Sequence, residues 1–126
     1  MIPVDLKYTK EHEWVKIEGT KAIIGVTDFA QHALGDVIFV ELPDVGKELM
    51  IGQVIGVVES VKAVSDIYAP CTCKVVAINE ALLNTPELVN QDPYGDGWMI
   101  EVDIKDLGGE LLSADQYEAL LVEEAK

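Results

Sequence analysis

Hydrophobic and polar residues alternate along most of the chain, in short runs separated by turn residues. Alternation of this kind puts every second side chain on one face and is typical of β-strands that bury one face. The run at 53–60 is apolar on both faces, as expected for a strand between two layers. The pattern predicts strands at residues 12–19, 21–26, 36–42, 47–52, 53–60, 63–70, 73–79 and 98–104.

Two segments carry helical signals instead. Thr27 is a good N-cap residue ahead of a short helix over 28–34. Ser113 and Gln116 form a capping box, which predicts a C-terminal helix near 113–125. The inward stripe of that helix is expected to consist of Tyr117, Leu120 and Leu121.

The order of these segments indicates a mainly β fold with small helices on its surface. The long excursion over 80–97 is expected to hold a helical turn at 80–84 or 86–90. The chain has no linker, low-complexity tract or heptad pattern, and 126 residues suit one compact unit. We therefore expect a single domain over 1–126, built as a β-sandwich or flattened barrel.

The chain is strongly acidic. Its 23 acidic and 9 basic side chains give a formal net charge of −14. A field of that sign repels phosphate backbones and anionic lipid surfaces, so nucleic acid and membranes are excluded as partners. The charge fits either simple solubility or docking on the basic faces of other proteins.

The apolar runs and the two cysteines indicate in which compartment the protein works and whether it binds a metal. No apolar run is long enough to span a bilayer, and the first residues lack the apolar core of a signal peptide. We expect a cytoplasmic protein, or one of the mitochondrial matrix if the chain is the processed form of an imported protein. Cys71 and Cys73 have no second pair at zinc spacing, so buried reduced thiols are expected and a metal site is not.

A lone lysine, Lys62, stands between two apolar strand-like runs where a hairpin turn is expected. Tight hairpin turns favour Asn or Gly, because their backbone needs positive φ, yet the tip here is Val61-Lys62. A Schiff-base nucleophile needs a lowered pKa, and the neighbouring Glu59 and Asp66 act in the opposite direction. An ordinary surface lysine explains neither the turn residues nor the flanking apolar strands. An amide-linked prosthetic group needs only a rigid, protruding lysine, which the tip offers.

The segment "GKELMIGQVIGVVESVKAVSDIYAP" resembles the lipoyl-attachment hairpin of the biotinyl/lipoyl domain family. Gly46, Gly52 and Glu59 stand sixteen, ten and three positions before Lys62, which is the spacing of that family. The resemblance implies a barrel-sandwich hybrid of antiparallel sheets, with the lipoyl hairpin near 53–70. It also implies lipoate attached to Lys62 as N6-lipoyllysine, with Glu59 recognised by the lipoylating enzyme.

Further motifs resemble the glycine cleavage system H-protein family. They are "YTKEHEWV" at 8–15, "GVTDFAQHALGDVIFVELPDVG" at 25–46 and "PELVNQDPYGDGW" at 86–98. These matches run in order over nearly the whole chain, and the final "YEALL" at 117–121 extends them. The set is far more specific than any one motif.

The resemblance implies a non-catalytic carrier whose lipoyl group visits three enzymes. A pyridoxal-phosphate glycine decarboxylase loads an aminomethyl group, and a tetrahydrofolate-dependent aminomethyltransferase removes its one-carbon unit. Dihydrolipoamide dehydrogenase then reoxidises the dithiol with FAD and NAD. A lipoate ligase or a lipoyl/octanoyl transferase would attach the group, and the carrier is expected to be a monomer.

Members of this family fold the loaded arm back into a cleft, and the matching residues here are Glu13, Leu34 and Asp66. Glu13 and Asp66 are expected to hold the cationic aminomethyl group by charge-assisted hydrogen bonds. The chain departs from the family at three places. It has Glu11 where some members carry Ser, Ala33 preceded by His32 where some carry His, and Cys73 in the place of a turn glycine. For His12 and His32 an ordinary surface or capping role is favoured over a role in the cleft.

Two other functions are compatible with the same lysine. One is a related carrier that passes lipoyl groups to other proteins or serves another lipoate-dependent enzyme. The other is an enzyme that uses Lys62 as a Schiff-base nucleophile, for which the acidic neighbours are unfavourable.

Overall fold

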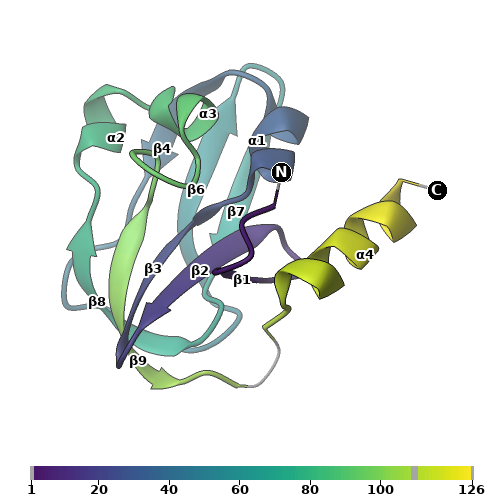
Figure 1. Cartoon of the computed structure of the whole chain (residues 1–126). Helices are drawn as coiled ribbons and strands as arrows, with labels where there is room; N and C mark the ends of the chain where they lie inside the picture. The colour runs from purple at the N-terminus through teal and green to yellow at the C-terminus, as the bar shows by residue number, and fades with distance from the viewer. Residues whose placement is uncertain (1, 109–110, 126) are drawn as a thin grey trace.

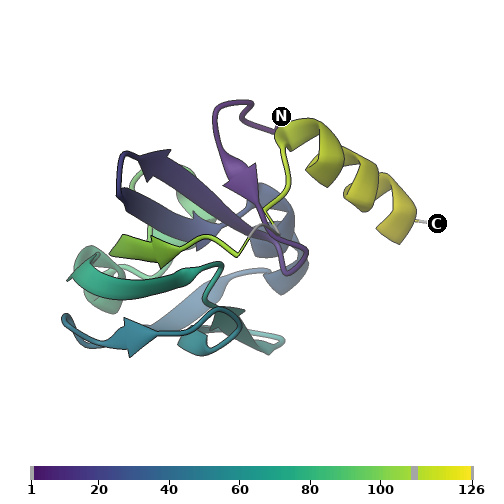
Figure 2. The ribbon, with the colours of Figure 1, turned by 90° about the horizontal axis from the view of Figure 1, so that it is seen from below.

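The structure, a computed structural model, describes residues 2–108 and 111–125 and consists of two antiparallel β-sheets packed face to face (Figure 1, Figure 2). The larger sheet has the strand order β1 (Lys7–Tyr8), β2 (Glu13–Glu18), β3 (Lys21–Val26), β9 (Ile100–Asp106), β8 (Thr72–Ile78) and β5 (Glu48–Leu49). The smaller sheet has the order β4 (Val37–Glu41), β6 (Val54–Ser60) and β7 (Val64–Tyr68). The helices are α1 (Asp28–Leu34), α2 (Ala81–Asn84), α3 (Leu88–Gln91) and α4 (Ala114–Glu124).

The predicted fold class is confirmed, and each predicted strand and helix has a counterpart. The segment over 47–52 pairs only through the two residues of β5, and both candidate helical turns of the 80–97 excursion form, as α2 and α3. Strand β1 was missed, since two residues are too few to show alternation. It is held by pairing with Trp14 and Val15 and by a bridge from Tyr8 to Leu112.

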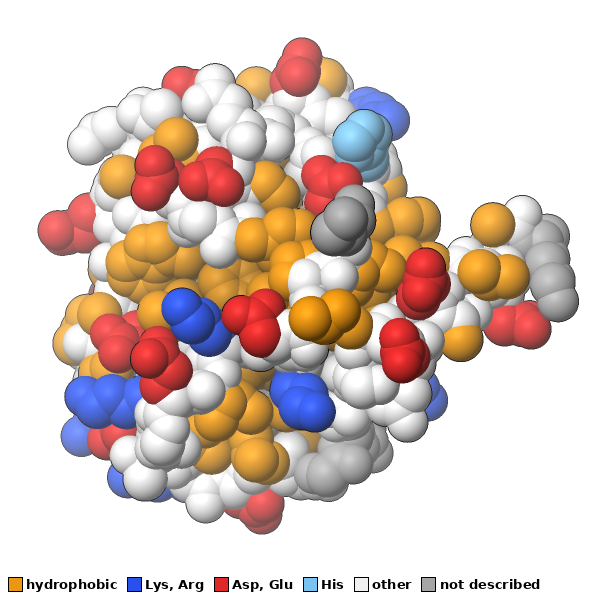
Figure 3. All heavy atoms as spheres, viewed as in Figure 1, with side chains coloured by type: hydrophobic (Ala, Val, Ile, Leu, Met, Phe, Trp, Pro, Cys, Tyr) orange, Lys and Arg blue, Asp and Glu red, His pale blue; other side chains and the backbone are white. Residues whose placement is uncertain are grey.

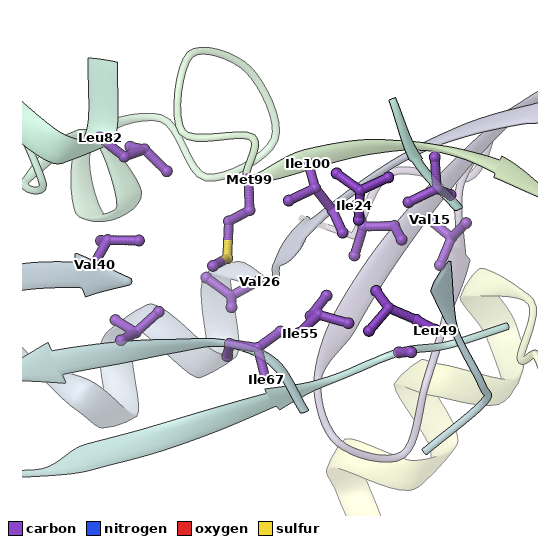
Figure 4. Packing of buried hydrophobic residues seen from close by; sticks show 14 of the residues in the cluster. Val15, Ile24, Val26, Val40, Leu49, Ile55, Ile67, Leu82, Met99 and Ile100 are labelled. Carbon is purple, nitrogen blue, oxygen red and sulfur yellow. The ribbon is translucent and has the colours of Figure 1, made fainter. Parts of the chain in front are cut away.

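The main hydrophobic core fills the space between the two sheets (Figure 4). Its side chains come from both sheets and from α1, α2 and α3, and each residue is at most 8% exposed. Branched residues dominate, as suits the pleated faces of packed sheets. The labelled members are Val15, Ile24, Val26, Val40, Leu49, Ile55, Ile67, Leu82, Met99 and Ile100.

A second, smaller cluster attaches α4 to the body. Tyr8 and Tyr117 stack with ring centroids 4.6 Å apart, and both are fully buried. The rest of α4 projects away from the sheets (Figure 1, Figure 2), so Leu120 and Leu121 of the predicted stripe are only partly buried. On the face seen in Figure 3, hydrophobic side chains form a band that runs toward α4.

His12 also holds α4 in place. Its Nδ1 lies 2.8 Å from the Tyr117 hydroxyl, and its Nε2 lies 3.0 Å from a carboxylate oxygen of Glu124. The Tyr117 hydroxyl lies 2.7 Å from Thr27 Oγ1, so the same contact joins the N-cap of α1 to α4. His12 is partly exposed, and its partners lie 105 residues or more along the chain, so it joins two distant segments rather than capping a helix locally.

Cys71 lies just before β8 and Cys73 lies within it. Both are buried and neither forms a disulfide, which confirms the expectation of reduced thiols. Cys73 is part of β8, and His12 is the only non-glycine residue with positive φ in the described part of the chain. Cys73 therefore does not have the positive φ that would favour glycine at its position. Within residues 2–108 and 111–125, no helix has the length and hydrophobicity to cross a membrane.

Candidate functional site

The hairpin between β6 and β7 ends in an exposed tip at Val61 and Lys62. The hydroxyl of Ser60 shapes this turn. Its Oγ accepts hydrogen bonds from the backbone N–H groups of Lys62 (3.3 Å) and Ala63 (3.1 Å). The same hydroxyl donates to the Ala63 carbonyl oxygen at 3.2 Å. The Ser60 N–H donates to the same carbonyl at 2.8 Å. A buried serine thus supplies the turn chemistry that a Gly or Asn would otherwise provide.

The tip is also tied to the segment between α1 and β4. The Val61 N–H donates to the Asp36 carbonyl at 3.0 Å. Gly35 ends α1 with φ at +78°, and a Cβ at that position would lie 3.1 Å from Lys62 Cε. The aliphatic stem of Lys62 therefore rests against Gly35, where any larger residue would be strained and would press on the lysine.

Asn90 holds the segment between α1 and β4 in place. Its Nδ2 donates to the Gly35 carbonyl at 2.8 Å and to Gln31 Oε1 at 3.0 Å, and its Oδ1 accepts from the Val37 N–H at 2.9 Å. Sequence reasoning missed Asn90 and Ser60 as supports of the tip. A serine two residues before the lysine was a local signal for such a turn, whereas Asn90 acts across more than 50 residues and left none.

The Lys62 amine is free for modification. The side chain is exposed, and within residues 2–108 and 111–125 it has no hydrogen bond or ion pair. No cluster of three or more metal-ligating side chains exists in this part of the chain. Among the described residues, the tip thus presents an exposed primary amine with no partner.

Glu59 lies half-buried in β6, directly opposite Phe39 of β4 and Val64 of β7. It stands on the outer side of the smaller sheet, because its neighbour Val58 is fully buried between the sheets. The structure thus places Glu59 on the same hairpin as Lys62, between two apolar side chains.

Glu13 is a buried carboxylate, with 1% of the residue exposed. Its Oε1 accepts from the Thr9 hydroxyl and its Oε2 from the Tyr68 N–H, each at 2.8 Å. Burial raises the pKa of Glu13 to about 7, although both hydrogen bonds act to lower it. A carboxyl in this state changes its charge near neutral pH.

Glu13 lines a cavity of about 340 Å³ between the N-terminal segment and the end of β7. The walls combine apolar and polar groups. The polar lining residues beside Glu13 are Thr9, Lys10, Glu11 and Tyr68. Ile51, Pro70 and Leu111 supply apolar walls. This cavity can take an apolar chain with a polar or cationic end.

The three residues predicted for the cleft are not gathered at that cavity. Asp66 is exposed on β7, two residues before Tyr68, and Leu34 is 8% exposed within the main core. Neither is among the residues that line the cavity. His32 is exposed on α1, and its Nδ1 lies 3.7 Å from Asp28 Oδ1. It is not among the residues that line this cavity.

The comparisons with known proteins agree over almost the whole chain. The model of the family "Glycine cleavage H-protein" matches residues 6–124. A glycine cleavage system H protein from Carboxydothermus hydrogenoformans is 56% identical over 128 residues, covering 100% of this chain and 98% of that protein. A probable glycine cleavage system H protein from Haloarcula marismortui is also 56% identical, over 92% of this chain and 93% of that protein.

A solved structure has the same fold. The crystal structure of a glycine cleavage system H protein from Mycobacterium marinum superimposes with a TM-score of 0.91 at 40% identity, over 96% of this chain and 99% of that chain. The sequence comparisons and the structure comparison therefore point to the same family. The chain belongs to the glycine cleavage H-protein family, whose members act as non-catalytic lipoyl carriers of the glycine cleavage system.

Proposed function

We propose that Lys62 is the residue that carries the lipoyl group, through an amide with its Nζ. The observation that supports this most directly is an amine without a partner among the described residues, on a turn held by Ser60, Asp36 and Gly35. The residues present fit such a group, because Lys62 and its neighbours Val61 and Ala63 are exposed at the tip of the hairpin. Acylation removes the charge of Lys62, so its stem can lie on apolar surface. The attached group supplies a disulfide that can be reduced while it accepts a one-carbon unit.

Glu59 is proposed as the residue by which a lipoate ligase or a lipoyl/octanoyl transferase recognises the hairpin. It is three positions before Lys62, and strand pairing to both neighbours keeps it in place. Its two apolar neighbours, Phe39 and Val64, partly exclude water, which strengthens an ion pair with a basic side chain of the enzyme.

The proposed partners in the cycle are the glycine decarboxylase, the aminomethyltransferase and dihydrolipoamide dehydrogenase. The family supports this set, and the net charge of −14 favours partners with basic docking faces. A single carrier domain that works as a monomer in the cytoplasm is consistent with this cycle.

Glu13 is proposed to hold the cationic end of the loaded arm. Its support is a carboxyl group that lines a cavity and has a pKa near neutrality. Asp66 is exposed on β7, two residues before Tyr68, which lines the cavity. Asp66 would add negative charge between the cavity and the lysine tip. The role of Leu34 in the cleft stays a prediction. Leu34 is buried at the end of α1, which suits packing in the interior rather than contact with the arm at the surface.

Intact-mass measurement and peptide mapping test the attachment site. The chain is produced with lipoate and a lipoate ligase, beside Lys62→Arg and, as a matched control, Lys74→Arg at an exposed position of β8. The parent and Lys74→Arg should gain one lipoyl mass increment on the Lys62 peptide, and Lys62→Arg should fold and gain none. A lipoyl increment on any other lysine of the parent would refute the assignment.

A further inference from the structure

Four large apolar side chains are exposed around the Lys62 tip. Ile38 and Phe39 of β4 are 52% and 54% exposed, and Val61 and Val64 of the hairpin are 67% and 66% exposed. Scattered surface apolar residues are ordinary, but these four lie on the Lys62 hairpin and on the strand that pairs with it. Such a group usually marks an interaction site.

A β-bulge in β4 creates half of this surface. Val37 pairs with Ser60 and Phe39 pairs with Glu59, so Ile38 is an extra residue in the ladder. In a regular strand, one of Ile38 and Phe39 would point into the core, since successive side chains alternate between faces. The bulge instead turns both outward, while Val37 and Val40 on either side stay buried.

The charges beside these side chains have one sign. The strands of the smaller sheet carry Glu41, Glu59 and Asp66 and no lysine or arginine. Glu41 and Asp66 are both partners of Val57 across the sheet, two rows from the row of Phe39, Glu59 and Val64. The surface therefore has an apolar centre at the tip with carboxylates beside it, and amide formation on Lys62 would remove its nearest positive charge.

We propose that this tip surface, formed by Ile38, Phe39, Val61 and Val64 with Glu41, Glu59 and Asp66 beside them, docks the enzyme that acylates Lys62. The inference rests on the proposed attachment at Lys62. The surface is continuous with that lysine, and an enzyme that brings Nζ to its reacting atoms must cover the residues next to it. The enzyme's matching face is apolar at the mouth of its site and carries lysine or arginine where it meets the three carboxylates.

A second copy of this chain fits the surface poorly. Two such faces would bring their carboxylates together, and like charges across an interface oppose association. The apolar centre alone covers only four side chains, which is few for a stable dimer interface. The charges therefore favour a basic partner over a second copy, and the position of the surface next to Lys62 favours the acylating enzyme.

The test measures kcat/KM for acylation of the apo chain by a purified lipoate–protein ligase. Phe39→Ser and Val64→Ser are compared with Val45→Ser and Val122→Ser, which alter similarly exposed apolar residues away from the tip. Each tip substitution should lower kcat/KM about 10-fold through KM, and each control should stay within about 2-fold. Ile38→Ser is included as a third tip variant, and urea unfolding restricts the comparison to variants that fold.

A charge series completes the test. Glu41→Gln and Asp66→Asn should raise KM at low salt, and the difference from the parent should shrink as salt is raised. Unchanged kcat/KM in folded Phe39→Ser, Val64→Ser and Ile38→Ser overturns the docking surface, while the attachment at Lys62 stands if peptide mapping still finds it. If the parent is acylated at a residue other than Lys62, the proposed attachment site is refuted as well. Sedimentation that finds a dimer of the parent, lost in Phe39→Ser, would assign the surface to self-association and overturn the proposal.

Discussion

The carboxylate of Glu13 accepts a hydrogen bond from the backbone N–H of Tyr68 at 2.8 Å and thereby joins β2 of the larger sheet to β7 of the smaller one. The two residues are 55 positions apart in the chain. Thr9 completes the site, because its hydroxyl donates to the other carboxylate oxygen and accepts from the Glu13 N–H at 3.1 Å. A buried, charged group at the junction of two sheets makes stability depend on pH.

Replacing Glu13 by Gln should stabilise the chain above neutral pH. The pKa of Glu13 is raised from 4.5 to about 7 in the folded protein, so the carboxyl is protonated in both states below pH 4.5 and contributes nothing there. Between pH 4.5 and 7 the unfolded chain binds fewer protons than the folded one, and stability falls as pH rises. Above pH 7 the full cost is present, about 3 kcal/mol from the linkage relation.

Urea unfolding from pH 4.5 to 8 checks this. Glu13→Gln should match the parent at pH 4.5 and exceed it by about 1–3 kcal/mol at pH 8, after allowing for imperfect hydrogen bonds of the amide. Glu18→Gln, at an exposed position of the same strand, should follow the parent at every pH. Parallel pH profiles for Glu13→Gln and the parent would show that Glu13 does not titrate with a raised pKa.

Replacing Ser60 by Ala should loosen the lysine tip without unfolding the chain. The substitution removes the acceptor for the N–H groups of Lys62 and Ala63, while the bond from the Ser60 N–H to the Ala63 carbonyl remains. We expect a loss of about 1 kcal/mol in the free energy of unfolding. Amide hydrogen exchange should accelerate at Lys62 and Ala63.

Ser65→Ala is the matched control for this change, since Ser65 is half-buried on β7 and makes no side-chain hydrogen bond within the described residues. It should leave exchange at the tip as in the parent. Equal exchange rates at Lys62 and Ala63 in Ser60→Ala and the parent would mean that the turn holds its shape by other contacts.

Replacing Cys73 by Gly should destabilise this chain. Cys73 is 1% exposed and pairs with Leu49 on one side and Ile104 on the other. Gly would leave a gap and loosen an extended strand, at a total cost of about 2 kcal/mol. Denaturant unfolding measures the loss, and Lys74→Gly, on the exposed face of β8, should cost less because only the backbone term applies. A Cys73→Gly chain as stable as the parent would contradict the placement of Cys73 in the core.

Much of the fold could be predicted from local patterns. Alternation located the long strands, the capping residues Thr27 and Ser113 located the starts of α1 and α4, and the turn between apolar runs located Lys62. These signals are local because hydrogen-bonded periodicity and cap geometry involve residues only a few positions apart. The spacing of Gly46, Gly52 and Glu59 before Lys62 added the expected lipoyl attachment through resemblance to a family.

The remaining features depend on pairings that no local pattern encodes. The apolar run of β4 does not reveal that a bulge turns both Ile38 and Phe39 outward, because only its register against β6 decides the face of each residue. Neither Asn90 beneath the tip nor the link from Glu13 to Tyr68 has a signal in the sequence around it. The sequence by itself determined the strands, the helix ends and the lysine at the tip, since local backbone geometry suffices for these. The tertiary structure decided what surrounds that lysine, because register and long-range hydrogen bonds exist only once the two sheets have packed.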